Sequence, residues 1–161
     1  MGAAATTPLT RRLGIKPGHE VVVMGMVPPS FVARLDLPPG ARVFRRLRPG
    51  PIDVLISFTD TLAELERRFA LLTSRLHPDG AMWVCWPTAQ ARRPTDITPD
   101  VIRRVGLAGG MIDNKACAID PSWRGLRLVV RPENRAALAY RAEPPLSVRR
   151  RRTTQPGKRP E

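Results

Sequence analysis

Three short, continuous apolar runs constrain the fold of this chain more than any other feature. Residues 20–26 read EVVVMGM, residues 52–58 read IDVLISF and residues 81–86 read AMWVCW. A strand that is apolar on both faces is typical of a parallel sheet covered by helices, whereas a strand with one wet face alternates apolar and polar residues. The runs therefore predict an α/β fold with a mostly parallel, Rossmann-like sheet flanked by helices.

Helical patterns separate and follow these runs. The clearest spans residues 62–76, where apolar side chains recur at steps of three and four and form one stripe. Thr61 and Glu64 form a capping box before this helix, and the Pro-Asp-Gly triplet at residues 78–80 ends it. The helix is predicted to cross between two parallel strands. Further helices are predicted at residues 8–13, 30–35 and 99–105, the last ended by Gly106, and a more polar edge strand at residues 41–46.

Residues 111–119 and 126–131 are two further strand-like stretches. The connection between them is too short for a crossover helix, so they are predicted to form a C-terminal antiparallel hairpin. The 161 residues suit one domain, which we place at residues 7–131 after a flexible N-terminus at residues 1–6. Residues 132–143 are a possible short helix.

The charge is strongly positive, with 27 Lys and Arg against 14 Asp and Glu and a formal net charge of +13. Residues 144–161 are rich in arginine and proline and poor in apolar side chains, which predicts a disordered tail. Its run of Arg149, Arg150, Arg151 and Arg152 would attract nucleic acid or an acidic partner. A solubilising tail without a dedicated partner is the favoured alternative, because the tail has no aromatic residue to stack on bases.

A second group of arginines, Arg42, Arg45, Arg46 and Arg48, lies in and after the predicted edge strand. Such side chains hold phosphates in some nucleotide sites. They also discourage a sheet edge from pairing with another chain, and that interpretation is favoured.

Several classes of protein are disfavoured by the sequence. No apolar run approaches the about 20 residues that cross a bilayer, and no secretory leader is visible, so a cytoplasmic protein without membrane attachment is expected. With only His19 and His77 beside them, Cys85 and Cys117 give neither a disulfide framework nor a four-ligand zinc site, and are predicted to be buried. The absence of a P-loop or a Ser-His-Asp order argues against a standard hydrolase or NTPase.

Two resemblances extend this interpretation. The stretches DVLI at residues 53–56 and LHPDGAMWV at residues 76–84 are similar to the fourth and fifth strands of class I S-adenosylmethionine-dependent methyltransferases, with one strand-helix unit of the first half missing. A closer resemblance, to a small bacterial family known as a domain of unknown function, is carried by LGIKPGH (13–19), PDGAMW (78–83), TDIT (95–98), DNKACAID (113–120) and WRGLRL (123–128). It implies the fold and lends no activity. Thr88 and Ala89 stand where that family has lysines, so an anion-binding role of those lysines is not carried over.

The residues do not support the methyltransferase cofactor. In the turn after the first strand, MGMVPPS, Gly25 is the only glycine, and Pro28 and Pro29 have no amide to donate. Arginines follow the second strand where a carboxylate for ribose hydroxyls is expected. S-adenosylmethionine is therefore not supported, the cofactor is unknown, and the leading interpretation is a non-catalytic Rossmann-like binding or interaction domain.

Ligands of open α/β sheets bind outside the carboxyl ends of the strands. This rule, with two loop residues and a polar strip on the hairpin, gives the candidate ligand-binding residues Ser30, Phe58, Thr59, Trp86, Pro87, Thr95, Asp96, Asp113, Asn114, Lys115 and Trp123. A divergent methyltransferase-like enzyme with its site near Trp86, Pro87, Asp96 and Lys115 is the alternative function. Thr95 and Asp96 also suit a turn and a helix entry, and Lys115 suits a structural ion pair with neighbouring carboxylates, which is favoured.

Overall fold

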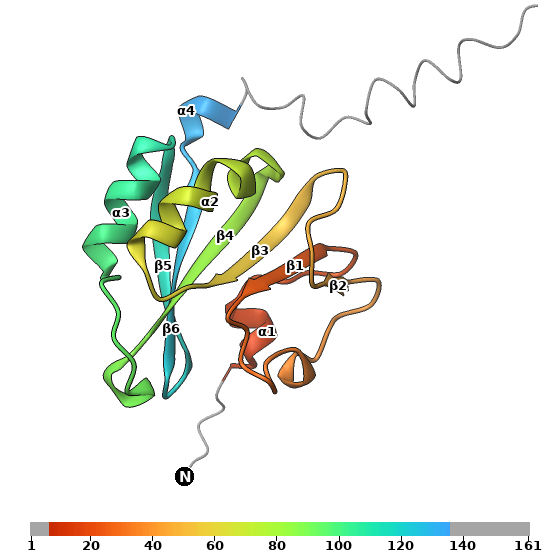
Figure 1. Cartoon of the computed structure of the whole chain (residues 1–161). Coiled ribbons are helices and arrows are strands. Elements are labelled where there is room, and N and C mark those ends of the chain that lie inside the picture. The colour runs from red at the N-terminus through yellow and green to blue at the C-terminus, as the bar shows by residue number, and fades with distance from the viewer. Residues whose placement is uncertain (1–6, 136–161) are drawn as a thin grey trace, which may run out of the picture.

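The computed structural model describes residues 7–135, which form a six-stranded sheet and the helices that cover it (Figure 1). The strands are β1 (Glu20–Gly25), β2 (Arg42–Phe44), β3 (Ile52–Phe58), β4 (Leu76–Pro87), β5 (Met111–Asp120) and β6 (Trp123–Val130). The α-helices are α1 (Leu9–Arg12), α2 (Leu62–Ser74), α3 (Pro99–Ala108) and α4 (Pro132–Arg135), and the 3-10 turns are η1 (Val32–Arg34) and η2 (Ala89–Ala91).

The sheet has the order β2-β1-β3-β4-β6-β5. Strands β2, β1, β3 and β4 are parallel, β6 runs antiparallel to β4, and β5 and β6 form the predicted hairpin. This confirms the α/β fold with a mostly parallel sheet. The three apolar runs form the central strands β1, β3 and β4, where both faces of the sheet are covered and most side chains are buried.

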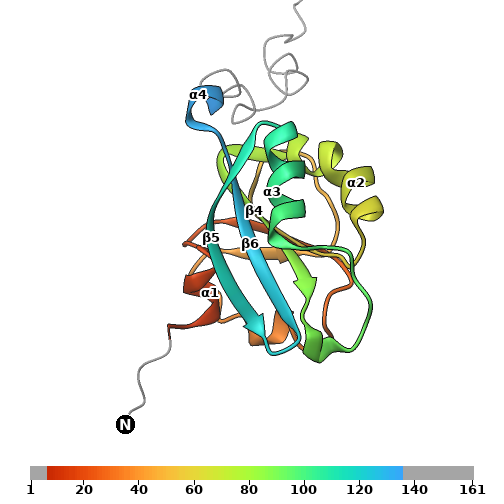
Figure 2. The ribbon, with the colours of Figure 1, turned by 90° about the vertical axis from the view of Figure 1, so that its left-hand side faces the viewer.

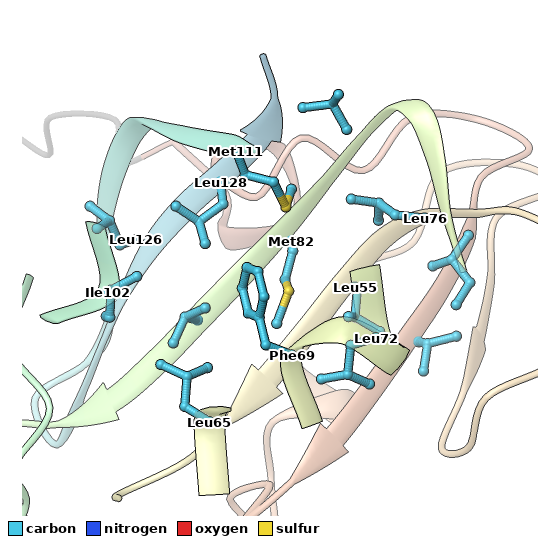
Figure 3. Packing of buried hydrophobic residues seen from close by; sticks show 14 of the residues in the cluster. Leu55, Leu65, Phe69, Leu72, Leu76, Met82, Ile102, Met111, Leu126 and Leu128 are labelled. Atoms are coloured by element: carbon cyan, nitrogen blue, oxygen red, sulfur yellow. The ribbon is translucent and has the colours of Figure 1, made fainter. Parts of the chain in front are cut away.

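The two faces of the sheet carry two separate apolar clusters. Helices α2 and α3 cover one face, and α1 with η1 covers the other (Figures 1 and 2). On the α2 face, Phe69 packs among side chains from the strands, beside Met82 (Figure 3). Residues alternate between the faces along β3, so Leu55 faces α2 whereas Ile56 and Phe58 face α1.

Glycines account for two boundaries that differ from prediction. Helix α3 continues through Gly106 to Ala108, because Gly106 is buried against the Leu128 side chain, at 3.2 Å from a hypothetical Cβ, rather than ending the helix. The Pro-Asp-Gly triplet lies within β4 instead of before it. A register shift between Ile52 and Val54 accommodates these residues, and Gly80 approaches the Asp53 carbonyl too closely for any side chain.

Other elements are shorter than predicted. The helix expected at residues 30–35 is the single turn η1, and the edge strand is confined to β2. Of the helix expected at residues 132–143, α4 is described, and its remainder lies outside the described residues, as does the tail at 144–161. Among residues 7–135, none of the helices has the length and apolar character needed to cross a membrane.

Candidate functional site

The carboxyl ends of β1 and β3 lie where the chain leaves the sheet in opposite directions. After β1 it passes through η1 on the α1 face, and after β3 it enters α2 on the other face. Such a topological switch point is where ligands of open α/β sheets bind. A pocket of about 240 Å³ lies there, which we call the switch-point pocket. Its lining includes Gly25, Met26, Ser57, Thr59, Glu64 and Arg68.

The turn after β1 closes tightly on β3. Gly25 has a φ of 90°, and a Cβ placed on it would lie 2.0 Å from the Phe58 carbonyl oxygen. The Met26 amide donates to the same oxygen at 2.9 Å, and the amide of Phe31 donates to the Pro28 carbonyl. Because the Met26 and Phe31 amides bond within the protein and Pro28 and Pro29 have none, these four residues offer no amide to a phosphate or a cofactor.

Ser57 supplies the least satisfied polar group in the switch-point pocket. The residue is 8% exposed, and its hydroxyl makes no hydrogen bond to any of the residues 7–135. No fully buried side-chain oxygen of the described residues lacks a partner, so the Ser57 hydroxyl faces the pocket, where water or a bound molecule can reach it. Sequence reasoning misses Ser57 because a lone serine in an apolar strand has the same pattern as a core residue.

Charged side chains of both signs line the pocket from α2. Glu64 accepts two hydrogen bonds from Arg67, at 2.7 and 2.8 Å, and lies 3.8 Å from Arg68. The hydrogen bond from Arg67 lowers the pKa of the Glu64 carboxyl. Arg68 has no closer carboxylate among the ion pairs of the described chain, so its guanidinium is available to a ligand. A glutamate and an arginine four residues apart on a helix are typical of a helix-stabilising contact, so Glu64 and Arg68 do not stand out as a site in the sequence.

Two of the residues predicted at strand ends reach the switch-point pocket. Thr59 is 4% exposed, and its hydroxyl donates to the Thr61 carbonyl at 3.4 Å. Phe58 contributes its backbone, while its ring packs edge to face against Phe31 and Trp123 on the opposite face of the sheet. Ser30 is exposed and lies outside the lining of this pocket.

The predicted loop residues after β4 hold secondary structure together. The Thr95 hydroxyl donates to the Asp60 carbonyl at 2.8 Å, and the Asp96 carboxylate accepts from the Leu62 amide at 2.7 Å. These bonds fasten the loop to the N-terminus of α2. Trp86 is 7% exposed in the cluster under α2 and α3, and Pro87 is buried.

The hairpin strip is occupied by structural contacts. Asp113 pairs with Arg103 at 3.1 Å, and the Asn114 side chain accepts from Arg127 at 3.2 Å. Lys115 departs from the expected ion pair, because its ammonium donates to the Arg12 carbonyl at 2.8 Å. Arg12 belongs to α1, so Lys115 lies on the opposite face of the sheet from Trp86. The structure therefore does not bring the residues of the alternative enzymatic site together.

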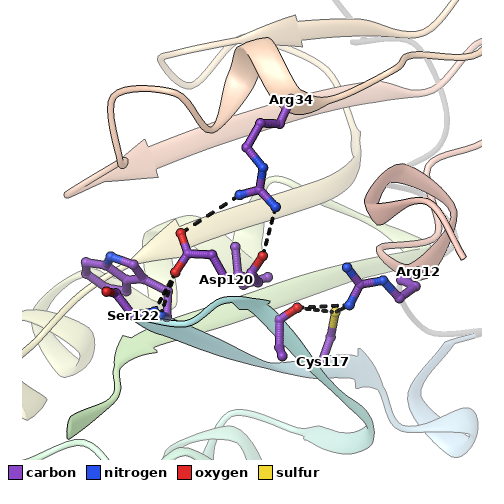
Figure 4. Close-up of polar contacts among 8 residues, drawn as sticks. Arg12, Arg34, Cys117, Asp120 and Ser122 are labelled. Carbon is purple, nitrogen blue, oxygen red and sulfur yellow. Dashed lines mark hydrogen bonds and ion pairs between the residues drawn. The ribbon is translucent and has the colours of Figure 1, made fainter. Parts of the chain in front are cut away.

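Two arginines on the α1 face bind the end of β5, next to the hairpin turn (Figure 4). Arg12 donates to the Ala118 carbonyl at 2.9 Å and to the Cys117 sulfur at 3.2 Å. Arg34 donates to the Ile119 carbonyl at 3.1 Å and lies 3.8 Å from Asp120, whose other oxygen accepts from the Ser122 and Trp123 amides. The contacts fix α1 and η1 against β5, the last strand of the sheet.

Two further sequence predictions concern groups elsewhere. Both cysteines are buried and free, as predicted, and burial raises the pKa of the Cys85 thiol well above its ordinary value. No group of three or more His, Cys, Asp or Glu side chains suited to a metal occurs among residues 7–135. Arg149, Arg150, Arg151 and Arg152 lie outside the described residues.

Solved structures of methyltransferases share this fold. Magnesium protoporphyrin IX methyltransferase from Synechocystis PCC 6803, with bound SAH, matches with a TM-score of 0.50 and 12% identity over 71% of this chain and 75% of the other. Aeropyrum pernix fibrillarin, in complex with S-adenosyl-L-methionine, matches with a TM-score of 0.54 and 12% identity over 75% and 73%. The mitomycin 7-O-methyltransferase matches with a TM-score of 0.57 and 12% identity over 78% of this chain and 53% of the other.

These likenesses define a class of fold. The chain has the Rossmann-like architecture of class I S-adenosylmethionine-dependent methyltransferases, with the antiparallel hairpin at the end of a parallel sheet. No protein-family model matches the chain, and no curated protein matches its sequence. The fold alone does not assign a reaction, which depends on the groups in the site.

Proposed function

We propose that the protein is a non-catalytic binding domain that holds a small polar molecule in the switch-point pocket and does not use S-adenosylmethionine. The observation that carries this proposal is the closure of the β1 turn on the Phe58 carbonyl, made by Gly25 and the Met26 amide. In dinucleotide-binding Rossmann folds a glycine-rich turn leaves room for the ligand to approach the backbone. Here the carbonyl of β3 occupies the position that a Gly25 side chain would take, and the Met26 amide is bonded to it.

The composition of the pocket supports a small ligand with hydrogen-bonding groups. The Ser57 hydroxyl lacks a partner among the described residues, and Arg68 and Glu64 offer opposite charges at the rim. The volume of about 240 Å³ is below the roughly 300–1,000 Å³ typical of sites for drug-sized ligands. A molecule with a hydroxyl or carboxylate group, smaller than a nucleoside cofactor, suits this space.

Calorimetric titration of the full chain with S-adenosylmethionine and with its demethylated product tests the proposal. We expect no saturable heat with either compound. Dissociation constants in the micromolar range would overturn the proposal in favour of the alternative, a divergent methyltransferase. The alternative is favoured by one observation, the position of the pocket at the switch point of a methyltransferase-like sheet.

Native mass spectrometry of the purified chain tests the pocket itself. We expect a small bound molecule on the wild-type protein and its loss from Ser57→Val, because two methyl groups replace the hydroxyl and make this part of the pocket apolar and narrower. Ser30→Val is the matched control, since Ser30 is exposed and outside the pocket. Retention of the molecule by Ser57→Val, or its loss from both variants, would contradict the assignment.

A further inference from the structure

We propose that the β2 edge of the sheet binds single-stranded nucleic acid. The β2 edge is defined here as Arg42, Phe44, Arg45, Arg46, Arg48 and Arg75, from β2, the loop that follows it and the end of α2. It lies at the outer strand of the sheet (Figure 1). It is independent of the switch-point pocket, which lies at the carboxyl ends of β1 and β3.

An aromatic ring faced by arginines is the centre of this surface. The guanidinium carbon of Arg48 lies 3.8 Å from the centroid of the Phe44 ring, and that of Arg42 lies 5.4 Å from it. Phe44 is half-buried against the cluster on the α2 face, so the ring is held in position. Arg75 donates to the Arg48 carbonyl at 3.2 Å and fixes the loop that carries Arg48.

A hollow accompanies the ring. It has a volume of about 250 Å³ and is lined by Arg42, Phe44 and Arg48, by residues 49–52, and by Val22 and the Arg42-paired Glu20 of β1. The Arg48 guanidinium covers the Phe44 ring, and its outer plane is flat, so an unstacked base can stack on that plane, as bases stack on arginine planes in proteins that bind single strands. The surface therefore offers both a place for a base and cations for the backbone.

The positive charge of the β2 edge is largely uncompensated. Arg42 pairs with Glu20, but Arg45, Arg46 and Arg48 have no carboxylate partner among the ion pairs of residues 7–135. All three residues are exposed. Exposed guanidinium groups without partners are available to phosphates, which they contact with charge-assisted hydrogen bonds.

The surroundings favour nucleic acid over a lipid surface. Proteins that lie on membranes combine basic side chains with large exposed apolar ones. Among the described residues the large exposed apolar side chains are Met26, Leu37, Leu71 and Leu107, and none belongs to the β2 edge. No strand of the described residues pairs with the outer edge of β2, so an extended single strand can approach that edge.

Fluorescence anisotropy of a labelled, mixed-sequence DNA strand of about 12 nucleotides tests the proposal with the full chain. The triple variant Arg45→Gln, Arg46→Gln, Arg48→Gln should bind roughly 100-fold more weakly at 0.1 M salt. Its plot of log affinity against log salt should lose about two units of slope, because each phosphate contact to a single strand contributes about 0.7. Phe44→Leu should lower affinity about tenfold and leave the slope unchanged, because Arg48 keeps its charge but loses the ring that holds its stacking plane in position.

A charge-matched control separates this surface from overall charge. Arg92→Gln, Arg104→Gln, Arg124→Gln removes three exposed arginines that also have no carboxylate partner among the described ion pairs. It should weaken binding much less than the edge variant. Equal losses from the two triple variants would overturn the proposal, since binding would then follow net charge alone.

Two alternatives to nucleic-acid binding at the β2 edge are binding through the tail and binding to a lipid surface. Replacing Arg149–Arg152 by glutamine, with or without the edge substitutions, should leave the ratio of DNA affinities between the unsubstituted edge and the edge variant unchanged. If that replacement abolishes binding, the tail and not the β2 edge is the nucleic-acid site. Vesicles of phosphatidylserine should not bind; vesicle binding that depends on Arg45, Arg46 and Arg48, with no binding of the DNA strand, would overturn the proposal in favour of a membrane surface.

Discussion

At the scale of single residues, Gly25 is the position that tolerates least change. Gly25→Ala would place a methyl group 2.0 Å from a backbone oxygen at a φ of 90°, so backbone and not a flexible side chain must move. We expect a loss of at least about 3 kcal/mol in unfolding free energy, measured by urea denaturation. Gly14→Ala is the matched control, because Gly14 has a φ of 80° but no atom within 4 Å of the added Cβ.

The control should lose only the about 1–2 kcal/mol that the left-handed conformation costs an alanine. Equal losses for the two variants would show that the backbone conformation matters and the contact between β1 and β3 does not. That outcome would also remove the main support for a closed β1 turn.

Cys85 gives the fold a specific pH dependence. Burial raises the pKa of its thiol in the folded state above the about 8.5 of an unfolded chain. The folded protein therefore holds a proton that the unfolded chain releases, and the resulting stability is complete below about pH 8.5 and is lost as the pH rises. Cys85→Ala should flatten the fall of unfolding free energy between pH 8 and pH 10 by up to about 1.4 kcal/mol per pH unit. An unchanged pH profile would contradict this.

Reactivity of the same thiol provides a second measurement. Iodoacetamide should leave Cys85 unmodified in the native protein at pH 8 and modify it in denaturant, as followed by peptide mass spectrometry. Modification of Cys85 in the native protein, without denaturant, would contradict the burial of its thiol.

Individual side chains differ in how far the sequence predicts them. The burial of both cysteines follows from their apolar surroundings, and the turn in which Thr95 accepts from the Ile97 amide follows from its place before α3. The contact of Lys115 with the Arg12 carbonyl does not, because it joins residues far apart in the chain. The position of Ser57 in a pocket cannot be predicted from the sequence either, since it depends on where β1 and β3 separate in space.

At the scale of elements, the start of α2 depends on two capping groups. Thr61 accepts from the Glu64 amide, as its capping box predicts, and Asp96 accepts from the Leu62 amide. Asp96→Ala should cost about 1 kcal/mol of unfolding free energy by chemical denaturation, because one amide of the first turn loses its partner.

Asp79→Ala is the control for this change, since Asp79 is exposed and its carboxylate makes no hydrogen bond to the described residues. It should alter stability by less than about 0.5 kcal/mol. A loss from Asp96→Ala no larger than that of the control would show that water replaces the cap at no cost.

Element type is more predictable than element length in this chain. The apolar runs identify β1, β3 and β4 because burial on both faces leaves a local signature. The ends of β4 and α3 depend on tertiary contacts, namely the bulge opposite Asp53 and the packing of Gly106 on Leu128. A glycine that ends a helix and a glycine that packs closely against a neighbour look alike in sequence.

At the scale of the whole molecule, Trp83 joins the N-terminal segment to the centre of the sheet. It is fully buried in β4, and its indole nitrogen donates to the Leu13 carbonyl at 3.0 Å. Trp83→Phe should cost about 3 kcal/mol by urea unfolding, because it leaves a cavity and an unsatisfied carbonyl. Trp86→Phe should cost less, since the indole of Trp86 makes no hydrogen bond to the described residues. The reverse order would contradict this.

The contact between Arg12 and Ala118 has a consequence for association between molecules. β5 is the last strand of the sheet, and its outer backbone groups are a template on which a foreign strand can pair. On β5, the carbonyl oxygen of Ala118 already accepts a hydrogen bond from the Arg12 guanidinium. At the other edge of the sheet, β2 is only three residues long and is followed by arginines. An incoming chain must displace a cation at one margin or approach several at the other. The architecture thus resists growth into amyloid-like stacks from either side.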